Sequence, residues 1–230
     1  GMGMAQAAGL PFVQEVFATG EVIKTLAPDT SVVVELGGED AKVIFFEGGT
    51  DERMNGSCAG GTGAFIDQMA TLLNVTPDEL DELSLKCERI YPIASRCGVF
   101  AKTDIQPLLN QGARKEDIAA SIYQAVVNQT IAGLAQGRRI GGKVMFLGGP
   151  LHYCKGLRER FTKTLELDSE HAVFPEYARF AVALGAALYA GRGSETVNVS
   201  TLEAKIENAV TKRSEANRLP PLFSSEQEYM

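Results

Sequence analysis

The 230-residue sequence contains no tryptophan and only two histidines, His152 and His171. Neither histidine has a partner at metal-ligand spacing, which argues against a histidine-rich zinc site. Four cysteines are too few for a disulfide scaffold in a chain of this length, so we expect a reducing, cytoplasmic environment. No apolar run approaches the roughly 20 residues that a membrane-spanning helix needs.

Positive charge is also scarce. The chain has 22 lysines and arginines against 29 aspartates and glutamates, a formal net charge of −7. Such a surface does not attract nucleic acid or an anionic membrane by bulk charge, so we expect neither as a partner. Hydrophobic residues make up 45% of the chain. That content is enough to bury the core of one large domain or two small ones.

Strand-like and helix-like segments alternate along the chain, which indicates the α/β class. Thr76, Pro77 and Glu79 form a helix-start motif in which the threonine is the N-cap and the glutamate reaches back to it. The segment 191–218 is polar and contains one amphipathic helical pattern. We expect strands at 31–36, 41–46, near 53, 90–94, 143–147 and 172–175, and helices at 12–26, 65–73, from 77 onward, 115–136, 151–165 and 178–189.

Three loops that follow predicted strands carry paired glycines. Glycine lets backbone N–H groups approach a phosphate closely, and a helix N-terminus adds partial positive charge. Each loop alone is also compatible with a simple tight turn, and none matches a Walker A or a dinucleotide-binding motif. Together they predict a nucleotide site built from Gly37, Gly38, Gly60, Gly61, Thr62, Gly63, Gly148, Gly149 and Pro150.

Glu35 is the candidate catalytic residue, because it stands at the end of a buried strand just before the first glycine pair. A carboxylate there could orient an attacking water or hold a magnesium-bound water. The alternative interpretation is a solvated acid at a strand end.

Two of the four cysteines lie in loops. Cys58 directly precedes a glycine-rich helix start, and Cys97 follows an arginine in a turn, so both thiolates would be stabilised. A lone cysteine is more often a small buried hydrophobe. Two ligands cannot complete an iron–sulfur cluster, which takes four thiolates, so a second copy of the chain would have to supply the others.

Five blocks in fixed order resemble a known family: ELGGEDAK at 35–42, MNGSCAGGTG at 54–63, SRCGVFA at 95–101, FLGG at 146–149 and LGAAL at 184–188. They are similar to the BadF/BadG/BcrA/BcrD ATPases, in particular to activators of 2-hydroxyacyl-CoA dehydratases. The resemblance covers roughly residues 12–190.

The resemblance implies an actin/hexokinase/Hsp70-like (ribonuclease H-like) ATPase fold and ATP with Mg²⁺ as ligand. It implies a homodimer that shares one 4Fe–4S cluster, held by Cys58 and Cys97 of each copy, while Cys87 and Cys154 are structural. ATP hydrolysis would drive a low-potential electron, taken from ferredoxin or flavodoxin, to a CoA-ester dehydratase or benzoyl-CoA-reductase-like partner in an anaerobic cytoplasm. Gly37 and Gly38 match the second phosphate loop, with Glu35 where the family has Asp, and Gly148 and Gly149 match the adenosine loop.

The same resemblance predicts an N-terminally truncated domain. The family's first phosphate loop, an Asp-x-Gly-Ser/Thr turn, is absent from the sequence. We expect residues 1–11 to be a cloning remnant or linker, 12–190 to be the ATPase domain without its first phosphate-loop hairpin, and 191–230 to be a polar helical linker to a following domain. The likeness is greatest to the first activase-like unit of long fused proteins.

Two other functions remain open at this point. A non-catalytic docking or scaffold domain would bind neither nucleotide nor metal. A small-molecule kinase of the same superfamily would use the glycine loops but would be indifferent to changes at both loop cysteines.

Overall fold

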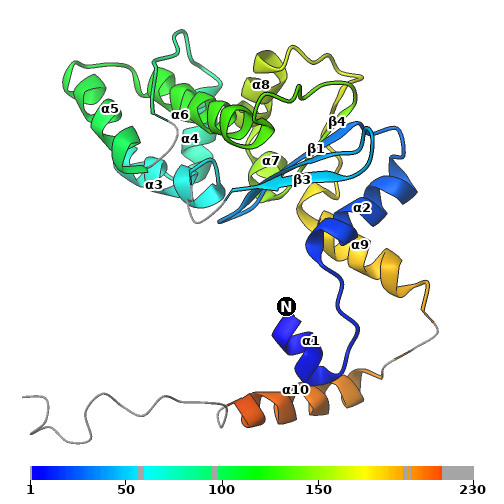
Figure 1. The fold of residues 1–230 in the computed structure, drawn as a ribbon. Coiled ribbons are helices and arrows are strands. Elements are labelled where there is room, and N and C mark those ends of the chain that lie inside the picture. Colours follow the sequence, from blue (N-terminus) through cyan, green and yellow to red (C-terminus); the bar gives the residue numbers. More distant parts are fainter. Residues whose placement is uncertain (1, 56–59, 95–97, 194–195, 197, 214–230) are drawn as a thin grey trace, which may run out of the picture. The chain divides into compact units, whose positions relative to one another are not determined.

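The computed structural model describes residues 2–55, 60–94, 98–193, 196 and 198–213 (Figure 1). The chain divides into two compact units, one of residues 15–188 and the other of residues 1–14 with 189–230. In the second of these, helix α1 (Met2–Ala8) contacts α10 (Val199–Arg213). None of the described helices is both long and apolar enough to cross a bilayer.

A five-stranded mixed sheet is the centre of the unit of residues 15–188. Its order is β3-β2-β1-β4-β5. The first three strands form an antiparallel meander, and β4 and β5 add to it in parallel, one after the other. The strands are β1 (Val32–Leu36), β2 (Ala41–Phe45), β3 (Asp51–Met54), β4 (Val144–Leu147) and β5 (Ala172–Val173).

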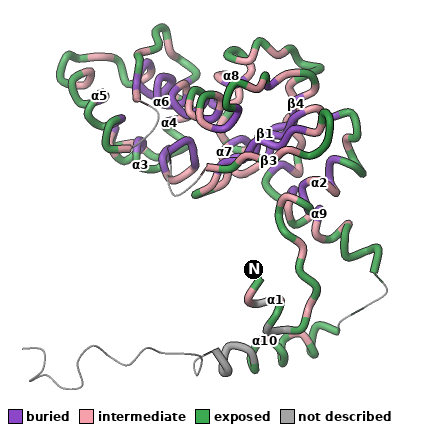
Figure 2. Tube along the Cα trace, in the orientation of Figure 1, coloured by how far each residue is buried: buried purple, intermediate pink, exposed green. Residues whose placement is uncertain are grey.

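Helices cover both faces of this sheet, and the alternation of side chains along each strand supplies both cores. Val34 and its neighbours on one face pack against the larger helical layer, whereas Val33 and Ile44 face α2 and the start of α9. Figure 2 shows the central strands buried between the layers. The larger layer holds α3 (Gly63–Leu73), α4 (Pro77–Ser84), α5 (Gly98–Asn110), α6 (Lys115–Gln129), the π-helical segment η1 (Thr130–Ala135), α7 (Gly149–Tyr153) and α8 (Lys155–Thr164); the smaller holds α2 (Glu15–Leu26), η2 (Ala178–Phe180) and α9 (Ala181–Ala190).

The α/β class is confirmed, and so is the helix start at Thr76. The Thr76 hydroxyl accepts a hydrogen bond from the Glu79 N–H (3.2 Å), and the Glu79 carboxylate accepts one from the Thr76 N–H (2.7 Å). Other elements are shorter than the sequence predicts: the helix expected at 115–136 becomes π-helical at Thr130, and the one after Pro150 breaks at Cys154.

The strand predicted at 90–94 is wrong, because this segment has no regular secondary structure and joins no sheet. Side chains of two helices accept hydrogen bonds from two of its backbone N–H groups instead. Ser121 of α6 accepts from the Tyr91 N–H (2.8 Å), and Asp104 of α5 accepts from the Ala94 N–H (2.7 Å). These side chains supply acceptors that a neighbouring strand would otherwise provide.

Candidate functional site

All three predicted glycine loops meet at one cavity of about 900 Å³. Two of them follow β1 and β4, which are adjacent and parallel, so their carboxyl ends lie at the same edge of the sheet. Such an edge is where α/β proteins bind ligands. Of the residues predicted to bind a nucleotide, Gly38, Gly63, Gly149 and Pro150 line the cavity.

The loops touch at Gly63, the first residue of α3. A Cβ on Gly63 would lie 3.3 Å from the Gly37 carbonyl oxygen, 3.3 Å from the Gly38 Cα and 3.4 Å from the Pro150 Cγ. The Gly63 N–H donates to the Gly37 carbonyl (2.9 Å), and the Ala64 N–H donates to the Gly38 carbonyl (2.7 Å). The first two amide groups of α3 therefore bind the neighbouring loop, and this contact closes the base of the cavity.

Gly148 has to be glycine for two reasons. Its φ of +94° belongs to the region that side chains avoid, and a Cβ would lie 2.0 Å from the Leu36 carbonyl oxygen. The loop after β4 can therefore pass directly over the end of β1, which brings Gly149 and Pro150 to the cavity.

The remaining predicted loop residues lie behind the cavity wall. Gly60, Gly61 and Thr62 are buried. Gly61 has a φ of +83°, and a Cβ on it would lie 3.3 Å from the Cγ of Gln129 at the end of α6. Thr62 is the N-cap of α3 but its side chain does not cap the helix. These residues shape the loop rather than line the cavity.

The opposite wall comes from α4, α7 and α8, and the sequence did not indicate it. It contributes Tyr153 and Lys155 at the α7–α8 junction. It also contributes carboxylates, which, with two from the loop side, make a strongly acidic lining: Glu39, Asp67, Asp78, Asp81 and Glu82. The capping motif at Thr76 predicted the first residue of α4, but it did not predict that the C-terminal part of α4 would contact α8.

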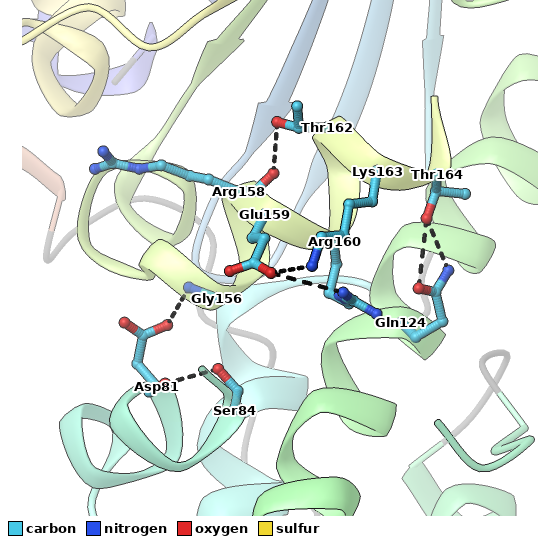
Figure 3. Close-up of polar contacts among 10 residues, drawn as sticks. All are labelled: Asp81, Ser84, Gln124, Gly156, Arg158, Glu159, Arg160, Thr162, Lys163 and Thr164. Carbon is cyan, nitrogen blue, oxygen red and sulfur yellow. Dashed lines mark hydrogen bonds and ion pairs between the residues drawn. The ribbon is translucent and has the colours of Figure 1, made fainter. Parts of the chain in front are cut away.

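Asp81 connects α4 to α8 within this wall (Figure 3). Its carboxylate accepts hydrogen bonds from the Lys155 N–H (2.9 Å) and the Gly156 N–H (2.9 Å), the first amides of α8. The N-cap of α8 is Cys154, whose side chain makes no capping bond, so Asp81 caps the helix from outside. A Cβ on Gly156 would lie 1.9 Å from the Ser84 Oγ, so glycine permits this close contact of α4 and α8.

Cys154 also lines the cavity, as a free thiol. Burial raises the pKa of this thiol to about 11. It is therefore protonated at neutral pH and a poor nucleophile. Cys87, the other described cysteine, is also free.

The candidate catalytic residue, Glu35, is held behind the first glycine pair. Its carboxylate accepts hydrogen bonds from the Lys42 ammonium (3.2 Å) and from the Thr19 hydroxyl of α2 (3.3 Å). Burial raises the pKa of Glu35, and the Lys42 charge works against that rise. The carboxylate is thus on the α2 side of the sheet, and Glu35 is not part of the cavity lining.

Cys58 and Cys97, the predicted cluster ligands, lie outside the described residues. Within the described part of the chain, no group of three or more histidine, cysteine, aspartate and glutamate side chains is arranged to hold a metal ion. Gly98, the residue after Cys97, packs against α3, because its Cβ position is 2.7 Å from the Gln68 Oε1. The start of α5 is therefore close to the helix that follows Cys58.

Comparison with known proteins gives the chain's relatives. The model of the BadF/BadG/BcrA/BcrD ATPase family matches residues 4–190. The chain is 38% identical over 165 residues to the (R)-2-hydroxyglutaryl-CoA dehydratase activating ATPase of Acidaminococcus fermentans, covering 71% of this chain and 62% of that protein. It is 30% identical over 181 residues to the 2-hydroxyisocaproyl-CoA dehydratase activator of Clostridioides difficile, covering 77% and 66%. The chain thus spans less than two thirds of each of these relatives.

Two solved structures share the fold. The A. fermentans (R)-2-hydroxyglutaryl-CoA dehydratase component A matches with a TM-score of 0.69 at 34% identity, covering 77% of this chain and 67% of that one. The C. difficile activator with bound ADPNP also has a TM-score of 0.69, at 25% identity, covering 90% and 71%. The predicted fold class is therefore confirmed.

Proposed function

Because the chain belongs to the BadF/BadG/BcrA/BcrD ATPase family, we propose that residues 15–188 are the nucleotide-binding unit of an activator for a 2-hydroxyacyl-CoA dehydratase or benzoyl-CoA-reductase-like enzyme. One observation carries this proposal. Three glycine loops from separate parts of the chain meet at a single cavity, and a Cβ on Gly63 would lie within 3.4 Å of both other loops. A tight turn that serves only folding has no need of two further glycine loops beside it.

The nucleotide would bind as its Mg²⁺ complex. Five carboxylates line the cavity and Lys155 is the one lysine or arginine in the described lining, so a free polyphosphate would be repelled. Mg²⁺ is bound by nucleotide phosphates together with one or two carboxylates, which reverses that repulsion. The phosphates would lie near Gly38 and Gly63, and Gly149 and Pro150 would contact the adenosine.

Electron transfer is the second part of the proposal. Cys58 and Cys97 from each of two copies would hold a 4Fe–4S cluster, which supplies a low-potential electron for the partner enzyme. The close packing of Gly98 on α3 supports a common edge for the two cysteine-bearing segments. Val99 and Phe100, which follow Cys97, are 68% and 63% exposed and would suit a subunit interface. Ferredoxin or flavodoxin would be the electron donor, in the cytoplasm.

Iron and acid-labile sulfide, measured after anaerobic reconstitution, test the redox part of the proposal. We expect about four irons per dimer. Cys58→Ser and Cys97→Ser should each abolish iron binding, whereas the matched control Cys87→Ser should not. A folded dimer that binds no iron and no Mg–ATP would refute the activator and leave the docking domain as the function. Phosphoryl transfer to a small acceptor, unaffected by either loop-cysteine change, would favour the kinase.

A further inference from the structure

Lys42 is buried at the centre of a group of carboxylates. Its side chain is 2% exposed, and its ammonium lies 3.2 Å from Glu35, 3.1 Å from Asp40 and 3.2 Å from Glu15 of α2. Burial favours the neutral amine, but these carboxylates raise the pKa of Lys42 above its ordinary value. Glu52 of β3 also faces the group, and the Lys42 charge acts on it. A buried lysine with several acidic partners stays charged and is costly to leave unpaired.

Two of the three carboxylates that Lys42 binds flank one turn. Glu35 is the last residue but one of β1, two residues before Gly37, and Asp40 lies directly before β2. The Gly37 N–H donates to the Asp40 carbonyl (2.8 Å) and closes the turn. The Asp40 side chain folds back over Gly37, since a Cβ there would be 2.1 Å from the Asp40 Oδ1.

The tip of this turn is part of the cavity. Gly38 and Glu39 line it, and the carbonyls of Gly37 and Gly38 accept the first two amides of α3. A change in the turn would therefore move the cavity base and the start of α3 together. Lys42 itself does not line the cavity, so it can act on a ligand only through the turn.

We propose that Lys42 is a positioning residue that clamps the two ends of the Gly37–Asp40 turn and so fixes the part of the cavity that holds the nucleotide's phosphates. This inference rests on the proposed nucleotide site. It concerns phosphate contacts, because Gly38 at the tip of the turn and Gly63 at the start of α3 are the loop residues assigned to the phosphates, and the carbonyls of the turn bind the first amides of α3.

Calorimetric titration with Mg–ATP and with adenosine tests the proposal on the full chain. Lys42→Met should weaken Mg–ATP binding at least about tenfold, as expected for loss of a charged hydrogen-bonded group. Adenosine affinity should not change. Asp40→Ala removes one end of the clamp at a residue that is only half-buried, so a folding defect is less of a concern than at Lys42, and it should act in the same direction. Lys42→Arg should restore part of the affinity, and Lys143→Met, at the exposed pair with Asp29, is the matched control.

Hydrogen exchange of the Gly37 amide gives a readout that does not depend on any ligand. Exchange should be faster in Lys42→Met and Asp40→Ala than in the wild type and in Lys143→Met. If the wild type binds no Mg–ATP, the proposed function fails, and this exchange rate still decides the role of Lys42. Equal exchange in all variants, or equal loss of ATP and adenosine affinity, would overturn the clamp.

Discussion

Removal of Lys42 should destabilise the fold strongly at neutral pH. Lys42→Met leaves the Glu35 carboxylate buried with only the Thr19 hydroxyl as a described partner, since Lys42 supplied its ion pair. Breaking a buried ion pair from one side costs about 3–5 kcal/mol in free energy of unfolding. The exposed pair of Lys143 and Asp29 should be worth less than about 1 kcal/mol, so Lys143→Met is the reference for a lysine lost elsewhere.

The size of this loss should depend on pH. Burial raises the pKa of Glu35 above its ordinary value of 4.5, so the folded protein favours the protonated acid. The contribution of Glu35 to stability is therefore greatest below pH 4.5 and is lost as the pH rises through the raised pKa. The Lys42 charge lowers the pKa of Glu35 and so opposes the effect of burial. Removing Lys42 therefore lowers the free energy of unfolding mainly at pH values above the Glu35 pKa, where the carboxylate is charged, and changes it little in acid. The gap between Lys42→Met and wild type should shrink in acid.

Urea denaturation of both proteins near pH 7.5 and near pH 4 measures the gap. The double variant Glu35→Gln with Lys42→Met removes both charges and should recover part of the stability, because no buried charge remains. A loss below about 1 kcal/mol at neutral pH, or one that is the same at both pH values, would refute the buried ion pair as described. So would a double variant that is no more stable than Lys42→Met.

Two further predictions concern the cavity walls. Gly148→Ala would bring a Cβ to 2.0 Å from the Leu36 carbonyl oxygen and should cost at least about 2 kcal/mol in urea denaturation. The adjacent Gly149→Ala meets no atom within 4 Å and should be nearly neutral; equal effects would contradict the close loop contact. Asp81→Ala should cost about 1–2 kcal/mol, because α8 loses its cap, whereas Glu82→Ala on the same helix should not. Similar stabilities of these two variants would exclude capping by Asp81.

The glycine loops were predictable from sequence because the requirement for glycine is set by the local backbone conformation. A turn with positive φ or a close backbone approach excludes other residues wherever the rest of the chain lies, as Gly148 illustrates. That two of the loops share one edge also follows from the class, since adjacent parallel strands end on the same side.

The partners of Glu35 were harder to predict, although one signal was present. A four-residue turn between antiparallel strands at 32–36 and 41–45 puts residue 35 opposite residue 42, as the observed pairing of Glu35 with Lys42 has it. Combining strand register with charge would have identified this pair and shown the acid to be occupied. The side of the sheet it faces depends on which helices pack there.

The acidic wall could not be predicted, because it depends on contacts between helices far apart in sequence. Asp81 looked like one of several acids on an exposed helix, and only the packing of α4 on α8 makes it a cap. The false strand at 90–94 has the same cause. Two of its backbone N–H groups donate to Asp104 and Ser121, whose positions no local pattern encodes.

Binding of Mg–ATP to wild type and to Gly63→Val tests most directly whether the three loops form one nucleotide site. The Cβ of the valine would lie within 3.4 Å of both neighbouring loops and its two methyl groups would push them apart, whereas the Cβ of the control Gly20→Ala on α2 meets nothing within 4 Å. We expect one Mg–ATP per chain in the wild type and in Gly20→Ala, and its loss in a folded Gly63→Val protein. No binding to the folded wild type, or undiminished binding to Gly63→Val, would contradict a nucleotide site at the junction of the three loops.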